Sequence, residues 1–151
     1  MPTHFSGSPR TVLALDSFIK LTRAAAGLET RVFSANNLEG LTPSQFFVLE
    51  ALYHLGALSQ GEVSKKVSRS TGNMTLVLDN LEKQGLVRRQ RESEDRRRVT
   101  IHLTPTGELL IRRIFPQVAA AILDGMSVLD PDEQEQLGNL CKKLGKGTSS
   151  I

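Results

Sequence analysis

The amino-acid sequence predicts a mainly α-helical protein with one small β-hairpin, a winged helix-turn-helix flanked by N- and C-terminal dimerisation helices. Capping signals open a succession of helices along the 151 residues. The hydrophobic period changes from helical to two only once, in the segment that ends at Leu103. Six arginines fall in that same segment, between Arg88 and Arg98. A thin basic hairpin is therefore expected directly after a cluster of short helices.

The first helix is predicted to begin at Ser8-Pro9 and to run to about Asn36-Asn37, before Gly40. Its apolar positions recur at helical spacing over a length unusual for a globular helix. They are Leu15, Phe18, Ile19, Leu28, Val32 and Phe33. We assign residues 9–38 to dimerisation.

Three helices then follow in close succession. Thr42-Pro43-Ser44-Gln45 and Ser59-Gln60-Gly61-Glu62 are capping boxes, and Gly56 is a natural stop between them. A fourth helix is expected to begin near residues 68–70 and to end before Gly85. Its inward stripe is Met74, Val77, Leu78 and Leu81.

The hairpin is predicted from alternation of apolar and polar residues. Val99, Ile101 and Leu103 alternate with polar residues, and Leu86-Val87-Arg88-Arg89 is the expected partner strand. The polar run from Arg91 to Arg96 forms the tip of this wing.

Two further helices complete the fold. The fifth begins after Thr104-Pro105 and the sixth after Asp130-Pro131, and both carry apolar stripes. We expect one domain over residues 1–151, with residues 41–104 as the DNA-binding region and residues 105–145 as dimerisation helices.

Composition and the start of the chain indicate where in the cell the protein is expected. The net charge is +3, 39% of residues are hydrophobic, and no run approaches the roughly 18 apolar residues of a membrane helix. The start of the chain lacks the order of a signal peptide, and the single cysteine, Cys141, cannot form an intramolecular disulfide. A cytoplasmic protein without a membrane partner is expected.

The outward residues at the start of the fourth helix are the candidate readers of bases or phosphates. Because the second helix of a helix-turn-helix enters the major groove, polar groups there can bond base edges or the backbone. These residues are Ser70, Thr71, Asn73 and Thr75. The alternative is that Ser70 and Asn73 only cap the helix.

The arginines of the wing are the second candidate group, since a thin hairpin can reach the minor groove. They are Arg88, Arg89, Arg96, Arg97 and Arg98. Asp95 repels phosphate, so its expected role is to hold a neighbouring guanidinium in a bidentate pair and aim it. The alternative is a solvated hairpin of mixed charge.

The sequence resembles the multiple antibiotic resistance regulator (MarR) family. The resemblance rests on LEKQGLVRR from Leu81, EDRRR from Glu94 and LTPTG from Leu103, and the specific motifs span about residues 41–107. It implies a homodimer that presents two reading helices to a pseudo-palindrome, with Asp95 orienting Arg97 into the minor groove. Leu76 departs from the pattern, because many members carry Arg or Lys there.

The resemblance also implies a small aromatic or phenolic effector, although no residue of its site is identified. Oxidant-sensing members use a cysteine in the first helix, whereas Cys141 lies on an apolar stripe of the last helix and is interpreted as packing. His4, His54 and His102 are scattered, so no metal site is expected. We find no catalytic or cofactor motif and expect neither an enzyme nor a cofactor.

The prediction is therefore a ligand-responsive repressor that binds double-stranded DNA and dissociates when an effector changes the separation of its two reading helices. One alternative is an architectural DNA-binding or RNA-binding module. The few aromatic residues, one Tyr and six Phe that lie mostly on core stripes, argue against the stacking platforms that RNA binding requires. Another is a protein-interaction adaptor on a winged-helix scaffold.

Overall fold

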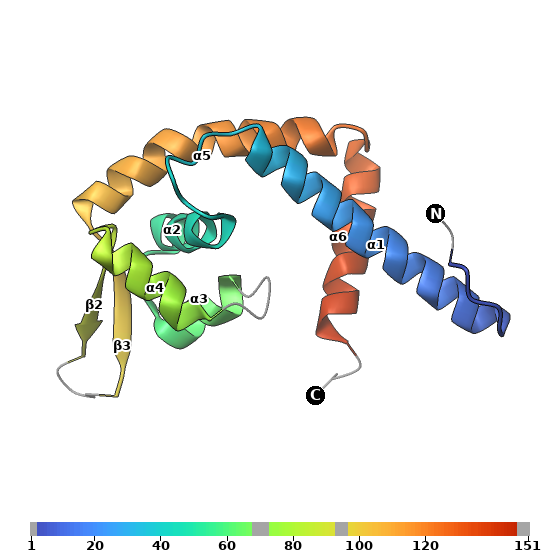
Figure 1. Ribbon diagram of the computed structural model, residues 1–151, viewed down its shortest axis with the longest axis horizontal. Helices are drawn as coiled ribbons and strands as arrows, with labels where there is room; N and C mark the ends of the chain where they lie inside the picture. Colours follow the sequence, from blue (N-terminus) through green and yellow to red (C-terminus); the bar gives the residue numbers. More distant parts are fainter. Residues whose placement is uncertain (1–2, 68–72, 93–96, 148–151) are drawn as a thin grey trace. The chain divides into compact units, whose positions relative to one another are not determined.

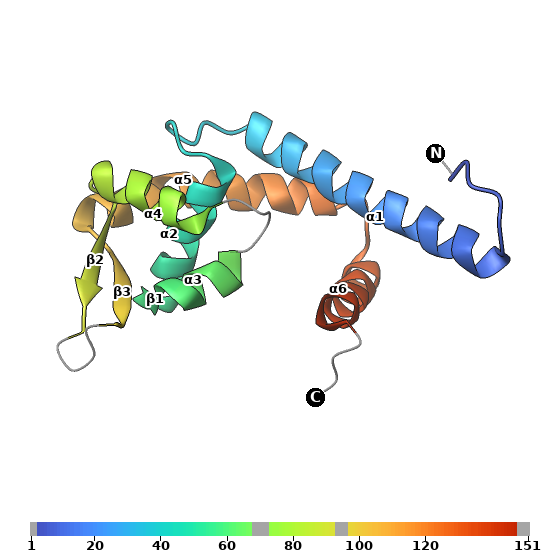
Figure 2. The ribbon, with the colours of Figure 1, turned by 60° about the horizontal axis from the view of Figure 1, so that its bottom comes forward.

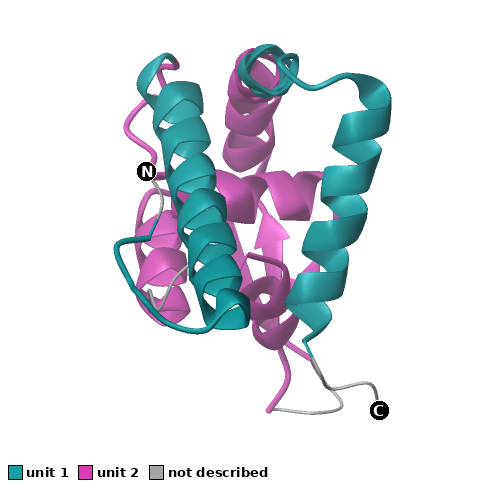
Figure 3. Cartoon of the chain, turned by 90° about the vertical axis from the view of Figure 1, so that its right-hand side faces the viewer, with its two compact units in different colours: residues 1–35, 119–151 teal, residues 36–118 magenta. Residues whose placement is uncertain are grey.

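The computed structural model describes residues 3–67, 73–92 and 97–147. The chain divides into two compact units, which Figure 3 colours separately. Unit 1 comprises residues 1–35 and 119–151, and unit 2 comprises residues 36–118. The helices are α1 (Pro9–Ser34), α2 (Pro43–Leu55), α3 (Gln60–Val67), α4 (Met74–Lys83), α5 (Pro105–Met126) and α6 (Pro131–Lys146), labelled in Figure 1.

The predicted helix starts are confirmed at five positions, including the start of α5 at Pro105, where the Thr104 hydroxyl accepts a hydrogen bond from the Gly107 amide. Ser8 caps α1, and Thr42 and Asp130 form complete capping boxes at the starts of α2 and α6. At α3 the Ser59 hydroxyl accepts the Glu62 amide at 3.1 Å, and the Glu62 carboxylate accepts the Ser59 amide at 2.8 Å. Each cap satisfies amide groups that have no partner inside the helix.

The start of α4 differs from the expectation. Asn73 is the N-cap, its backbone is extended (φ −71°, ψ 101°), and its side chain accepts the Thr75 amide at 3.0 Å. The helix therefore begins at Met74 rather than near residues 68–70. An Asn side chain that bonds its own backbone two residues ahead favours such a cap over helical continuation.

The wing is a pair of antiparallel strands, β2 (Val87–Arg91) and β3 (Val99–Leu103), in register from Val87 opposite Leu103 to Arg91 opposite Val99. A third strand, β1 (Leu58–Ser59), was not predicted and pairs with the other edge of β3. Two residues are too few to show alternation, so only the partner strand identifies it. Figure 2, turned from the view of Figure 1, shows the β2–β3 hairpin projecting away from α2, α3 and α4.

The core of unit 2 contains all the largest side chains that are fully buried in the described chain. They come from α2, α3, α4, the sheet and the first half of α5. They are Phe46, Val48, Leu49, Val63, Leu78, Leu81, Val87, Ile101, Ile111, Ile114 and Val118. This core packs the inner face of α4 against the other helices and the sheet.

A close approach of backbone joins α5 to the start of β2. A Cβ built on Gly107 would lie 2.0 Å from the carbonyl oxygen of Leu86, so only glycine fits there. The Thr104 hydroxyl donates to the Gly85 carbonyl at 2.6 Å and accepts the Gly107 amide at 3.0 Å. The LTPTG motif is therefore a structural joint.

Unit 1 leaves much apolar surface exposed. No residue of α6 is buried, and Leu140 and Leu144 are 65% and 64% exposed. In α1, Phe18 is 64% exposed. An apolar groove within this unit is lined by Thr11, Ala14, Leu15, Ser17, Phe18, Leu21, Leu137, Leu140, Cys141 and Leu144. In the described chain, none of the helices has the length and apolar character needed to cross a membrane.

Candidate nucleic-acid interface

One face of α4 is buried and the opposite face is open. Leu78 and Leu81 are fully buried, with Met74 and Val77 half-buried beside them, which confirms the predicted inward stripe. Leu76 lies on the far side of the helix and is 56% exposed. An exposed apolar side chain in the first turn of this helix can contact the methyl group of thymine in a major groove.

Polar contacts occupy every backbone and hydroxyl group of Thr75. Its amide donates to the Asn73 side chain, which caps the helix as the alternative interpretation expected. Its hydroxyl oxygen accepts Nε2 of Gln60 at 3.2 Å. The hydroxyl keeps its own hydrogen, so Thr75 can still donate to an acceptor on a base or phosphate. Both Asn73 and Thr75 are exposed.

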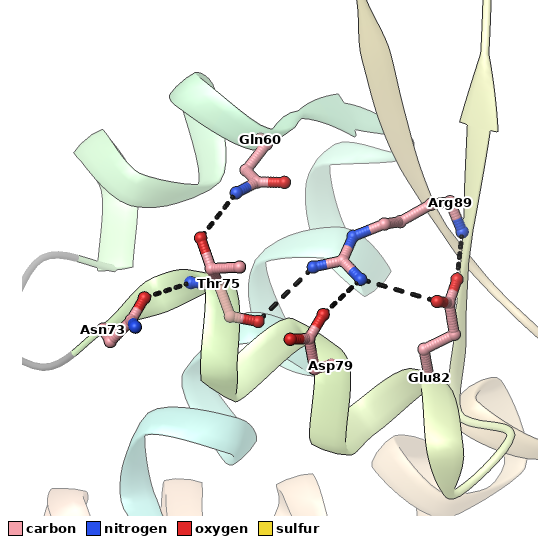
Figure 4. A network of polar contacts seen from close by, with 6 residues as sticks. All are labelled: Gln60, Asn73, Thr75, Asp79, Glu82 and Arg89. Atoms are coloured by element: carbon pink, nitrogen blue, oxygen red, sulfur yellow. Dashed lines mark hydrogen bonds and ion pairs between the residues drawn. The ribbon is translucent and has the colours of Figure 1, made fainter.

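Arg89 of β2 lies against α4 (Figure 4). Its Nη1 is 2.6 Å from Oδ1 of Asp79 and 3.5 Å from Oε1 of Glu82, and its Nη2 donates to the Thr75 carbonyl at 3.4 Å. The Arg89 amide also donates to Glu82 Oε2 at 2.9 Å. With 23% of its side chain exposed, Arg89 differs from the outward arginine that the sequence predicted.

The neighbouring residues of β2 face solvent. Arg88 is exposed and its Nη1 donates to Oε1 of Gln90 at 2.7 Å, while Arg91 is exposed at the end of the strand. Alternation along the strand turns Arg88 away from the side that Arg89 occupies. The strand therefore presents Arg88 on the side opposite Arg89.

Arg97 and Arg98 are exposed and approach the first turn of α3. They line an open depression together with Ser59, Gln60, Gly61, Ser64 and Val99. The hydrogen bond from the Ser59 amide is the main cause that lowers the pKa of Glu62. Some loss of contact with water opposes this shift, while the Ser59 hydroxyl and the positive charges of Arg98 and Lys66 add to it. This depression joins the wing to the helix-turn-helix.

Four of the predicted contact residues lie outside the described residues. Ser70 and Thr71 precede the Asn73 cap in sequence, and Asp95 and Arg96 belong to the expected tip of the wing. The structure brings the other predicted residues onto α4 and the wing.

Sequence reasoning missed Gln60, Asp79 and Glu82, which hold Thr75 and Arg89. A signal was present, because Thr75, Asp79 and Glu82 are spaced i, i+4 and i+7 and so form one stripe along α4. Two carboxylates on a stripe flanking the core predict a basic partner on the neighbouring element.

Among the described residues, no group of three His, Cys, Asp or Glu side chains could hold a metal ion.

Comparisons with known proteins agree with this geometry. Residues 41–99 match the sequence profile of the MarR family. The chain is 34% identical over 135 residues to the HTH-type transcriptional regulator MhqR of Bacillus subtilis (strain 168), covering 89% of this chain and 93% of that protein.

Two solved structures are similar over most of the chain. One is Bordetella bronchiseptica BpsR, whose DNA binding is regulated by 6-hydroxynicotinic acid (TM-score 0.75, 27% identity, 85% of this chain and 98% of that chain). The other is NadR in complex with 4-hydroxyphenylacetate (TM-score 0.72, 28% identity, 97% of this chain and 99% of that chain).

Proposed function

The chain belongs to the MarR family of winged helix-turn-helix transcriptional regulators, and from this premise we propose that it is a ligand-responsive repressor acting as a homodimer on a pseudo-palindromic operator. As a member of this family it binds DNA and regulates transcription. Our proposal adds four points: repression, the homodimer, the residues that contact DNA, and the effector. Its proposed place of action is the cytoplasm. It works by binding and not by catalysis.

The observation that carries the proposal is the pairing of an open α4 face with a basic wing in one unit. The buried stripe of Leu78 and Leu81 leaves the opposite side of α4 free to enter a major groove. The arginines of the wing lie on a projecting hairpin that suits the backbone or the minor groove.

We assign contacts on this basis. The reading-helix set is Ser70, Thr71, Asn73 and Thr75, and the exposed face of α4 adds Leu76. In the wing, Arg88, Arg96, Arg97 and Arg98 contact DNA, with Asp95 orienting Arg97. Arg89 is given a different role below.

The apolar surface of unit 1 supports the homodimer. An apolar groove in α1 and α6, with Leu140 and Leu144 largely exposed, is more than a stable monomer leaves open to water. A second copy covers it and sets two reading helices about 34 Å apart, one helical turn of DNA. Residues 9–38 and 105–145 thus serve dimerisation and residues 41–104 serve DNA binding, within one domain.

The effector is proposed to be a small aromatic acid or phenol. This rests on BpsR and NadR, which respond to or bind hydroxylated aromatic acids. Such a ligand needs only to change the separation of the two reading helices, because both must fit the operator together.

Selection of duplexes from a random pool tests the function. The full-length protein should enrich an inverted repeat with half-sites about 10 base pairs apart. It should bind that duplex at least about 1,000-fold more tightly than random duplex at the same salt concentration. Hydroxybenzoic and hydroxyphenylacetic acids should then release it. An architectural module would enrich no sequence, and an adaptor would bind no better than its charge dictates.

A further inference from the structure

We propose that Arg89 is a positioning residue that holds α4 at a fixed angle to the wing and acts on DNA recognition through α4 without touching DNA. This inference rests on the proposed function, because it requires α4 to be the helix that reads the groove. It replaces the DNA contact that the sequence predicted for Arg89.

The contacts of Arg89 are spread along α4. They reach the Thr75 carbonyl in the first turn, Asp79 one turn later, and Glu82 near the end of the helix. The core holds the inner face of α4, and a single polar contact would restrain the other side of the helix at one point only. Contacts at i, i+4 and i+7 span two turns and restrict both movements.

The chemistry of the side chain fits this task. A guanidinium presents five N–H donors in a rigid plane, so one group can serve a carbonyl and two carboxylates together. The Arg89 amide adds a fourth contact, at Glu82 Oε2. Lysine would supply the charge as a single point and could not bridge the same three acceptors.

The first turn of α4 is held from the other side as well. Gln60 of α3 donates to the Thr75 hydroxyl while Arg89 donates to the Thr75 carbonyl, so α3 and β2 both hold this residue (Figure 4). Thr75 is the described residue that links the network to the reading surface. A displaced Arg89 would therefore misplace the residues that read DNA.

The test compares Arg89→Gln, Asp79→Asn, the double variant and wild type on two probes, a duplex selected by the wild-type protein from a random pool and a random-sequence duplex. Arg88→Gln is the comparison variant, because it removes the same charge from the next position on the opposite side of the strand. Since Arg88 is proposed to contact DNA directly, its loss should lower the salt slope and weaken binding to both probes alike. Affinities are measured over a series of salt concentrations, below the thermal midpoint of every variant.

We expect Arg89→Gln and Asp79→Asn each to weaken binding to the selected duplex about tenfold, with the double variant no worse than Arg89→Gln. Binding to random duplex should change by less than about twofold, so that specificity falls rather than general affinity. The salt slope should stay that of wild type, since no phosphate contact is lost.

Direct phosphate contact predicts different results. Arg89→Gln would then lower the salt slope by about 0.9 and weaken both probes alike, and Asp79→Asn would tighten binding by deleting a negative charge. Either outcome would overturn the inference. If Arg89→Gln does not fold, Arg89→Lys decides: retained affinity means that charge suffices, and a loss as large as that of Asp79→Asn supports positioning. A wild-type protein that selects no duplex would instead refute the proposed function.

Discussion

Glu39 and Arg113 lie 74 positions apart and are joined by two parallel hydrogen bonds, from Nε to Oε2 at 2.8 Å and from Nη2 to Oε1 at 2.9 Å. The backbone of Glu39 is in the left-handed region (φ 53°), which a residue with a side chain rarely adopts. The pair ties the loop before α2 to α5 within unit 2. Both partners lie close in sequence to the points where the chain passes from one unit to the other, at residues 35–36 and 118–119.

This pair predicts a stability that falls in acid. The hydrogen bond from Arg113 lowers the pKa of Glu39; the loss of some contact with water opposes this shift, and the positive charge of Arg113 reinforces it. A depressed folded-state pKa stabilises the protein above the unfolded value of 4.5 and stops doing so as pH falls through the folded value. The free energies of unfolding of wild type and Glu39→Gln are measured in urea from pH 7 to pH 3. The difference between them should be constant down to about pH 5 and should shrink toward zero below that pH. Arg113→Gln should behave as Glu39→Gln does, and parallel curves throughout would contradict this account.

The joint between α5 and β2 predicts a costly methyl group. Gly107→Ala places a carbon 2.0 Å from the Leu86 carbonyl oxygen, which is backbone and cannot turn aside. We expect the free energy of unfolding to fall by about 1–3 kcal/mol, as overpacking typically costs. The control is Gly61→Ala in α3, where nothing lies within 4 Å of the added carbon and stability should rise by roughly 0.5–1 kcal/mol. Equal effects of the two changes, measured by urea denaturation, would show that the joint relaxes.

How much the sequence predicts depends on the kind of interaction. Caps are local, so the starts of α1, α2, α3, α5 and α6 follow from the sequence alone. The start of α4 does not, because Asn73 competes with several earlier polar residues as the cap, and only the folded backbone decides which one closes the helix. β1 exists only because β3 lies beside it.

The same distinction applies to the site. The composition of the wing marks Arg88 and Arg89 equally, yet one faces solvent and the other pairs with α4. Alternation in a strand predicts that neighbouring residues differ, but which of them faces α4 depends on packing between elements distant in sequence. The basic character of the wing could therefore be predicted from the sequence, but which arginine faces solvent and which pairs with α4 could not.

The apolar groove of unit 1 predicts that the dimer fails when a charge is placed on α6. Leu140 is 65% exposed and lines this groove, so Leu140→Glu should leave the monomer folded. The new charge should prevent a second copy from packing on the groove. Light scattering at low micromolar concentration should give twice 16.6 kDa for wild type and 16.6 kDa for the variant. Lys142→Glu, an exposed neighbour that does not line the groove, should remain dimeric. A monomeric wild type would remove the basis for binding two half-sites.

The wing predicts that deleting a negative charge weakens DNA binding. If Asp95 aims Arg97 into the minor groove, Arg97→Ala should cost about 1–3 kcal/mol of operator binding and Asp95→Ala should also weaken it. A double-mutant cycle on Asp95 and Arg97, measured at several salt concentrations, separates the effect of orienting Arg97 from the effect of net charge. Tighter binding by Asp95→Ala, with additive losses at Arg97, would indicate that the wing is only a diffuse basic surface.

Leu76 predicts that the protein reads a thymine methyl group. It is 56% exposed on the face of α4 opposite the core, and the methyl of thymine is the one apolar feature that a base pair presents in the major groove. Replacing each thymine of the selected duplex in turn with uracil removes that methyl and nothing else. At one position in each half-site, this replacement should weaken the binding free energy of the wild-type protein by about 0.8 kcal/mol, roughly a fourfold drop in affinity, because one buried methyl group is lost. Leu76→Ala should bind the thymine and uracil duplexes alike. Lys83→Ala, also exposed on α4, should keep the wild-type preference. If wild type is indifferent to uracil at every position, Leu76 does not read the base.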